Sequence, residues 1–176
     1  MENNFTFKPL SFSDILLMYQ WFNLSHVQRF YSLRQWTEEQ VLEKLKPYIT
    51  GDKPVLGFIV LMNKNPIGYI QQCKISDYPW PNQDFSQEII DHATGIDIFI
   101  GEEKLIGRGV GYQIIKTFIK NKVWPQFRYC IVDPDINNIA AIKCYEKLNF
   151  QSHAVIETKD ALERPVKLKL MVLKHS

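Results

Sequence analysis

The chain has 176 residues, of which 45% are hydrophobic and 13% aromatic, enough for the core of one domain of ordinary size. The formal net charge of +2 is too small to favour nucleic acid or an anionic membrane as a partner. The three cysteines form no Cys-x-x-Cys pair and their number is odd, so we expect a reduced, cytoplasmic protein. The four histidines have no ligand spacing, and we predict no metal site.

No targeting or linking segment is evident in the pattern of residues. The first residues lack the apolar stretch of a signal peptide, and the longest apolar run, Val55–Met62, is too short to span a bilayer. No repeat or low-complexity segment interrupts the chain. We therefore expect one domain over residues 1–176, as a monomer or a homodimer.

Helix and strand signals alternate before the first hairpin. Thr37-Glu38-Glu39-Gln40 has the form of a capping box, which predicts a helix, and Gly51 is suited to end it. The expected elements are a strand at Phe5–Lys8, a helix from Ser13-Asp14 through Trp21, an irregular stretch rich in aromatic residues at Ser25–Trp36, and a helix through about Tyr48.

The middle of the chain predicts a hairpin followed by a long loop. Val55–Met62 and Ile67–Ile75 are rich in β-branched and aromatic residues, as central strands are. Asn63–Pro66 supplies turn residues between them. Ser76–Ala93 is polar and longer than most connections, so we expect a loop with a function.

Thr94–Ile100 alternates as a strand, with Asp97 and Phe99 on one face and three isoleucines on the other. Leu105–Gly111 follows, with glycines at 107, 109 and 111, and leads into an amphipathic helix. A glycine-rich turn lets backbone amides approach a ligand closely. Because a helix N-terminus favours negative charge, this turn predicts an anion site.

The last third begins with a strand at Arg128–Val132. Turn residues from Asp133 to Asn138 follow, and the next helix contains Asn-x-x-Ala-x-x-x-Tyr-Glu-Lys-Leu-Asn-Phe, which ends at Phe150. Two closing strands are expected near Gln151–Thr158 and Val166–Leu173.

This last motif resembles the final motif of the GNAT superfamily of acyl-CoA-dependent N-acetyltransferases, and Gly107–Gly111 resembles the pyrophosphate loop of that family. The family usually has Gln or Arg where this chain has Ile106, and Gly where it has Asn149. The resemblance implies an α/β (α+β) fold with a mixed, largely antiparallel central sheet and helices on both faces. It also implies acetyl-CoA as cosubstrate and no metal.

The resemblance further implies which residues bind the cofactor. They lie in the strand after Asp97, in the glycine loop and at the start of the last helix: Ile98, Phe99, Ile100, Gly107, Arg108, Gly109, Val110, Gly111, Tyr112 and Asn138. As a bare residue, Asn138 is equally a helix cap. A backbone N–H near Ile98 or Phe99 is the expected oxyanion donor.

Two residues are candidates for acid–base chemistry. Asp97 lies in an otherwise apolar strand beside the glycine loop, and a carboxylate can accept the proton that an ammonium must lose before it attacks. Tyr145 occupies the family's motif tyrosine and can donate a proton to the departing thiolate. The alternatives are a solvent-facing aspartate and a tyrosine that only packs in the core.

The substrate side points to a cation. From Asp77 to Glu103 there are seven acidic residues and no Lys or Arg, with aromatic residues between them. Such a stretch attracts a polycation, although an ordinary solvated acidic loop is the alternative. Gly95-Ile96-Asp97 and Asp133-Pro134 also resemble segments of aminoglycoside 6'-N-acetyltransferases. That resemblance implies amine binding by Asp97 and Asp133, with Asp77, Trp80 and Tyr31 or Trp36 on the pocket walls.

The leading hypothesis is therefore acetyl transfer to the 6'-amine of aminoglycoside antibiotics, which confers resistance. A first alternative keeps the fold and changes the amine to that of a metabolite, a siderophore hydroxylamine or a protein N-terminus. A second alternative is a non-catalytic module that binds acyl-CoA.

Overall fold

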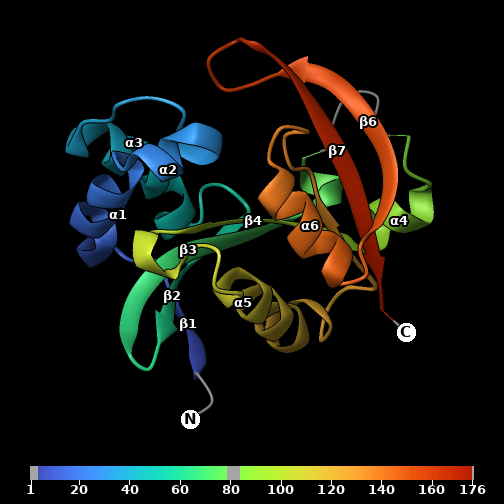
Figure 1. The fold of residues 1–176 in the computed structure, drawn as a ribbon, viewed down its shortest axis with the longest axis horizontal. Coiled ribbons are helices and arrows are strands. Elements are labelled where there is room, and N and C mark those ends of the chain that lie inside the picture. Colours follow the sequence, from blue (N-terminus) through green and yellow to red (C-terminus); the bar gives the residue numbers. More distant parts are fainter. Residues whose placement is uncertain (1–3, 79–83, 176) are drawn as a thin grey trace. The chain divides into compact units, whose positions relative to one another are not determined.

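The computed structural model describes residues 4–78 and 84–175. Its seven strands form a sheet in the order β1-β2-β3-β4-β5-β7-β6 (Figure 1). β4 and β5 run parallel, whereas β1 with β2, β5 with β7, and β6 with β7 run antiparallel. The strands are β1 (Phe5–Pro9), β2 (Val55–Met62), β3 (Asn65–Lys74), β4 (Ala93–Ile100), β5 (Tyr129–Val132), β6 (Gln151–Lys159) and β7 (Pro165–Lys174). The expected mixed, mostly antiparallel sheet is confirmed.

The chain divides into two compact units. The first comprises Met1–Gln72 and Asp97–Ile106, and the second comprises Cys73–Ile96 and Gly107–Ser176. None of the helices in the described part of the chain is long and apolar enough to cross a membrane.

The helices of the first unit are η1 (Phe12–Asp14), α1 (Ile15–Phe22), α2 (Ser25–Val27), η2 (Gln28–Ser32), α3 (Glu38–Thr50) and η4 (Glu103–Leu105). α3 begins with the predicted capping box: Gln40 N donates to Thr37 Oγ1 over 3.2 Å, and Thr37 N donates to Gln40 Oε1 over 3.1 Å. Gly51 ends it with a φ of 80°. The expectation of an irregular segment from Ser25 was wrong, because Ser25–Ser32 is helical and is ended by Leu33 at a φ of 64°.

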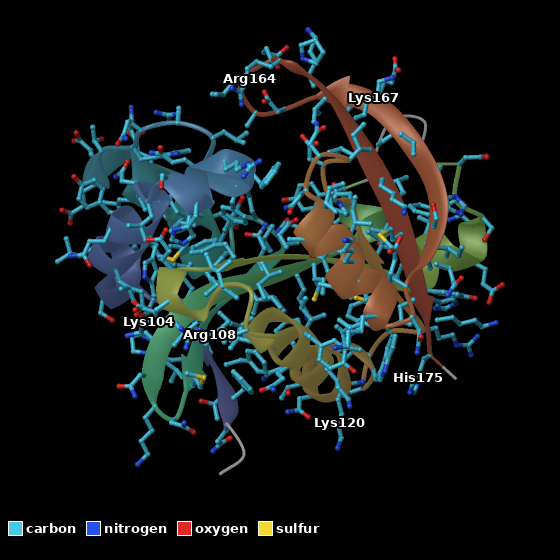
Figure 2. All side chains as sticks on the ribbon, in the orientation of Figure 1. Lys104, Arg108, Lys120, Arg164, Lys167 and His175 are labelled. Carbon is cyan, nitrogen blue, oxygen red and sulfur yellow. The ribbon has the colours of Figure 1, made fainter. Side chains whose placement is uncertain are left out.

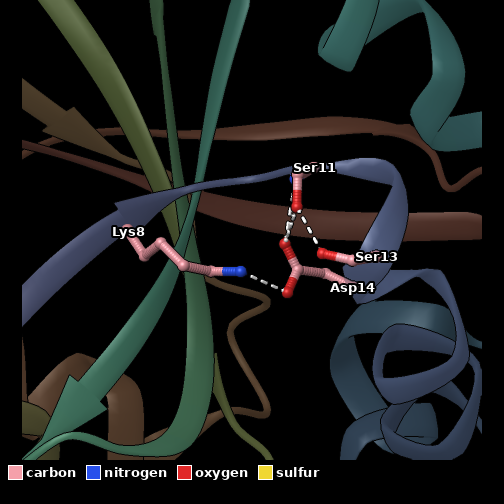
Figure 3. A network of polar contacts seen from close by, with 4 residues as sticks. All are labelled: Lys8, Ser11, Ser13 and Asp14. Carbon is pink, nitrogen blue, oxygen red and sulfur yellow. Dashed lines mark hydrogen bonds and ion pairs between the residues drawn. The ribbon is translucent and has the colours of Figure 1, made fainter.

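The start of α1 is held by a small polar network (Figure 3). Asp14 accepts hydrogen bonds from the backbone N–H and the hydroxyl of Ser11, over 2.9 and 2.8 Å. Lys8 on β1 pairs with the other carboxylate oxygen of Asp14. The network ties the first strand to the first helix through a carboxylate that is itself buried.

The second unit contains η3 (Ile75–Asp77), α4 (Gln87–His92), α5 (Val110–Phe118), η5 (Ile119–Val123) and α6 (Ile139–Lys147). The long loop expected after β3 is in part helical, since Ser86 caps α4 by accepting from Ile89 N. The apolar face predicted for α5 and η5 is buried. β6 and β7 form a long antiparallel pair (Figure 1). Their register shifts between Ser152 and Ala154.

Candidate active site

Asp97 is the polar residue of the second half of β4. Its neighbours Ile96 and Phe99 are buried, while solvent reaches the Asp97 side chain. Gln71 on β3 donates a hydrogen bond from Nε2 to Asp97 Oδ2 over 2.9 Å. Loss of hydration in the surrounding protein raises the pKa of Asp97, while the Gln71 hydrogen bond and the charge of Lys44 lower it. A carboxylate whose pKa is raised is a stronger base and so a better acceptor for the proton of a substrate ammonium.

Aromatic rings surround this part of β3 and β4. Phe99 lies 4.7 Å from Tyr31 and 5.8 Å from Tyr69 between ring centroids. Phe22 contacts both Tyr31 and Trp36, at 5.9 and 5.4 Å. Tyr31, which we expected at the substrate, therefore packs against Phe99, two residues after Asp97 on β4. Burial raises the pKa of Tyr31 and of Tyr69, so both hydroxyls stay protonated at neutral pH.

Two cationic side chains lie beside the ring of Trp36, one on α3 and one in the segment that precedes it. Arg34 stacks on Trp36, with the guanidinium carbon 3.9 Å from the ring centroid. Lys44 lies 5.8 Å from the same centroid on α3. Loss of hydration lowers the pKa of Lys44, and the charge of Asp97 raises it in part. The acidic site therefore has a resident cation, which no pattern in the sequence had suggested.

Gln71 was also missed by the sequence reasoning. The available signal was a pair of polar residues, Gln71 and Gln72, inside a strand that is otherwise apolar and aromatic. Successive residues of a strand point to opposite faces. Asp97 lies on the neighbouring strand, so Gln71 can face it while Gln72 is buried on the other side.

The other predicted β4 residues lie at the end of the strand. Ile98 and Ile100 are half-buried, and the carbonyl of Ile100 is 2.9 Å from His26 Nε2. Gly68 on β3 has no side chain, and a Cβ there would overlap the carbonyl oxygen of Phe99. The two backbones therefore approach closely beside the predicted oxyanion donor, whose role stays a prediction.

In the second unit, the glycine loop has the backbone that we predicted. Gly107 and Gly109 both have a φ of 74°, a conformation that costs a residue with a Cβ about 1–2 kcal/mol. A Cβ at either position would meet nothing within 4 Å, so the backbone there is bare and accessible. Arg108 between them is exposed (Figure 2). Bare backbone before a helix fits the diphosphate of a coenzyme.

α5 starts at this loop and carries a buried face that anchors it. Val110 is buried at its first position, whereas Tyr112 is half-buried and lies between two lysines. The Nζ atoms of Lys147 and Lys116 are 5.0 and 5.9 Å from the centroid of the Tyr112 ring. The start of α5 therefore lies beside positive charge from both α5 and the end of α6, which suits an anionic ligand.

α6 contains the other two predicted residues of this unit. Asn138 is its N-cap and accepts from Ala141 N over 3.3 Å, so the capping alternative holds for its side chain. Tyr145 is buried, with its ring 5.4 Å from that of Phe150. Asn149, two residues after the end of α6, has a φ of 67°, the left-handed conformation expected where the family has glycine. The catalytic role of Tyr145 stays a prediction.

Two more of the substrate candidates, Asp77 and Asp133, belong to the second unit. Asp77 is exposed at the end of η3, and Asp133 is half-buried directly after β5. Trp80 lies outside the described residues. Within the part of the chain that the structure describes, no three His, Cys, Asp or Glu side chains are grouped as metal ligands would be.

The mixed sheet, the glycine loop at α5 and the Asn-capped α6 together define an acyl-CoA-dependent transferase fold. Residues 12–158 match the acetyltransferase (GNAT) domain family. The chain therefore belongs to the GNAT acetyltransferases, as its motifs predicted.

Curated relatives and solved structures agree with this assignment. The chain is 26% identical over 166 residues to the aminoglycoside N(6')-acetyltransferase type 1 of Klebsiella pneumoniae, covering 90% of this chain and 80% of the relative. A crystal structure of aminoglycoside acetyltransferase AAC(6')-Ib with coenzyme A has a TM-score of 0.81 and 24% identity, covering 98% of this chain and 95% of that one. The aminoglycoside N(6')-acetyltransferase of Legionella pneumophila has a TM-score of 0.77 and 24% identity, covering 99% and 94%.

Proposed function

We propose that this protein transfers the acetyl group of acetyl-CoA to a primary amine of a polycationic small molecule, namely the 6'-amine of aminoglycoside antibiotics. The observation that carries the proposal is Asp97, a solvent-accessible carboxylate set among aromatic rings and held by Gln71. A carboxylate beside aromatic faces suits an ammonium on a sugar ring. The similarity to aminoglycoside N(6')-acetyltransferases over most of the chain supports the same substrate class.

The residues have separate roles in this reaction. In the second unit, Gly107, Gly109 and the first amides of α5 bind the diphosphate of acetyl-CoA, together with Arg108 and Tyr112. In the first unit, a backbone N–H of Ile98 or Phe99 is the oxyanion donor. Asp97 binds the substrate ammonium and takes its proton, which frees the lone pair for attack. The free amine then attacks the thioester carbonyl carbon, the C–S bond breaks, and Tyr145 donates its phenolic proton to the departing thiolate. The second proton that the acylated nitrogen loses restores the phenol.

Further acidic residues select for a substrate with several charges. In the second unit, Asp77 and Asp133 bind additional ammonium groups. In the first unit, Tyr31 supplies a face for a sugar ring. The reaction removes a positive charge from the drug, which is the basis of resistance. An odd number of cysteines without a Cys-x-x-Cys pair favours a reducing compartment such as the cytoplasm for this protein.

The test is release of free CoA thiol from acetyl-CoA with a panel of amines. The panel contains kanamycin-type aminoglycosides, matched analogues with a 6'-hydroxyl, a linear polyamine and a basic peptide. We expect turnover with the 6'-amines and none with the 6'-hydroxyl analogues. Turnover confined to the peptide or the polyamine would contradict the aminoglycoside assignment and leave an acetyltransferase for another amine. Tight acetyl-CoA binding without any turnover would indicate a binding module.

A further inference from the structure

Asp97 belongs to a chain of hydrogen bonds that begins at a buried tyrosine. We infer that Tyr69 and Gln71 are positioning residues, which act as a relay that holds the Asp97 carboxylate in the form and orientation that receives the amine. This inference rests on the proposed function of Asp97 and adds two residues to it. The relay lies wholly within the first unit.

The directions of the two hydrogen bonds determine how Gln71 is oriented. Tyr69 donates its hydroxyl proton to Gln71 Oε1 over 3.1 Å, and Gln71 donates from Nε2 to Asp97 Oδ2 over 2.9 Å. A flipped amide would place its oxygen against the carboxylate, bringing two acceptors together. The hydrogen bond from Tyr69 therefore fixes the orientation of the Gln71 amide, with its oxygen toward Tyr69 and its N–H group toward Asp97.

Tyr69 is itself held firmly. Its side chain is fully buried, and its ring packs 5.8 Å from Phe99 and 6.4 Å from Tyr31 between centroids. The hydroxyl lies directly over Gly57 on β2, where any Cβ would overlap it. The missing side chain of Gly57 thus leaves the space that the Tyr69 hydroxyl occupies. Because the Tyr69 ring is buried, the hydroxyl that donates to Gln71 is held in a fixed position.

The pKa of Asp97 depends on the charged and titratable groups near it as well as on the relay. They are Lys44 on α3, Tyr31 on η2 and Tyr69 on β3. Tyr48 on α3 is close to the two tyrosines. Loss of hydration raises the pKa of Asp97 and favours the protonated acid, which cannot accept a proton from the substrate. The Gln71 hydrogen bond and the Lys44 charge favour the ionised form. Without the relay, the pKa of Asp97 would rise further, so the carboxyl would stay protonated up to a higher pH.

The experiment separates the relay from mere packing. Gln71→Met keeps the size of the side chain and removes the donor, whereas Tyr69→Phe keeps the ring and removes only the hydroxyl. Gly57→Ala displaces the hydroxyl without changing any group of the relay. Gln72→Met is the matched control, because it makes the same change one residue along, on the opposite face of β3. Thermal melts establish that each variant is folded.

Two readouts are compared, the titration of the Asp97 carboxyl by 13C NMR without substrate and the pH profile of kcat/KM. We expect Gln71→Met to move both the titration and the acid limb to higher pH. Its kcat/KM should fall roughly ten- to hundredfold on the acid limb of the profile and recover as the pH rises. Tyr69→Phe and Gly57→Ala should produce smaller shifts in the same direction, and Gln72→Met none.

The two proposals fail differently. An unchanged Asp97 titration in folded Gln71→Met would overturn the relay, whatever the activity. A titration that moves as expected, in a protein that acetylates no aminoglycoside, would support the relay and reject the proposed substrate. An equal shift in Gln72→Met would also overturn the relay, since it would trace the effect to the strand as a whole.

Discussion

The indole ring of Trp21 lies directly against Gly101, so that a Cβ on Gly101 would overlap the ring. Trp21 is buried and packs edge-on against Phe99, at 5.9 Å between centroids. Gly101 follows the last residue of β4, and its N–H donates to the carbonyl of Ile67. The end of the strand that carries Asp97 is therefore positioned by contact between a glycine and a tryptophan.

The first prediction follows from that contact. Gly101→Ala should lower the free energy of unfolding by about 1–3 kcal/mol, because the buried ring has to move. The measurement is urea unfolding of Gly101→Ala, of Trp21→Phe and of the double variant. The smaller ring of Trp21→Phe makes room for the methyl group, so the double variant should lose less stability than the sum of the single ones. Strict additivity would show that the ring does not cause the loss.

The second prediction concerns the network at the start of α1 (Figure 3). Burial raises the pKa of Asp14, but the hydrogen bonds from Lys8 and Ser11 together lower it by more. The pKa of Asp14 in the folded protein is therefore below its ordinary value. A depressed carboxyl pKa gives stability that is present above the unfolded pKa and is lost as the pH falls through the folded pKa. Asp14→Asn should therefore lower stability by about 1 kcal/mol at pH 7.

The check is denaturant unfolding of both proteins from pH 7 downward. The difference between wild type and Asp14→Asn should shrink as the pH falls through the folded pKa of Asp14. Asp52→Asn is the control, because that carboxylate is exposed and accepts a hydrogen bond from the hydroxyl of Thr50, two residues away. A difference that stays constant down to low pH would mean that the Asp14 charge is not what stabilises the network.

The third prediction tests Asp97 as the base. Asp97→Asn should reduce kcat/KM for the amine by about 10²–10⁴, while the affinity for acetyl-CoA stays near that of the wild type. Asp91→Asn is the matched control from the same acidic stretch, since Asp91 is exposed on α4. Thiol release and calorimetric titration with acetyl-CoA measure the two effects separately. Full turnover in Asp97→Asn would remove the residue from the mechanism.

The fourth prediction tests Tyr145 as the acid. Tyr145→Phe should lower kcat roughly 10²-fold with little change in KM, as expected for a group used in the transition state. The control is Tyr129→Phe, which removes another tyrosine hydroxyl of the same unit, one that donates to Glu88. Steady-state kinetics on folded variants provide the comparison. An unchanged kcat in Tyr145→Phe would leave this residue a packing role beside Phe150.

The fifth prediction concerns the glycine loop. Gly109→Ala places a Cβ on a residue with a φ of 74°, a strain of about 1–2 kcal/mol. If the loop changes shape to relieve that strain, acetyl-CoA should bind roughly five- to thirtyfold more weakly. Gly51→Ala is the control, because Gly51 has a similar φ of 80° at the end of α3. Gly51→Ala should lose stability but no affinity for acetyl-CoA. Equal losses of affinity in both variants would argue against diphosphate binding at the glycine loop.

Most of the secondary structure could be predicted from the sequence because its signals are local. The capping box at Thr37 and the left-handed Asn149 each depend on a few neighbouring residues. The buried face of α5 follows from helical spacing. Prediction failed where the packing of other elements determines the conformation, as in the helical turns of Ser25–Ser32 and in α4.

The sequence by itself determined the order of the elements, the family motifs and the choice of Asp97, since a carboxylate stands out in an apolar strand. Only the tertiary structure decided which side chains surround that carboxylate. Gln71 is 26 residues away, and it meets Asp97 because the pairing of strands places them side by side. Lys44 reaches the same region from a helix. Such neighbours depend on strand register and helix packing, which are set by the whole core and by no local pattern of residues.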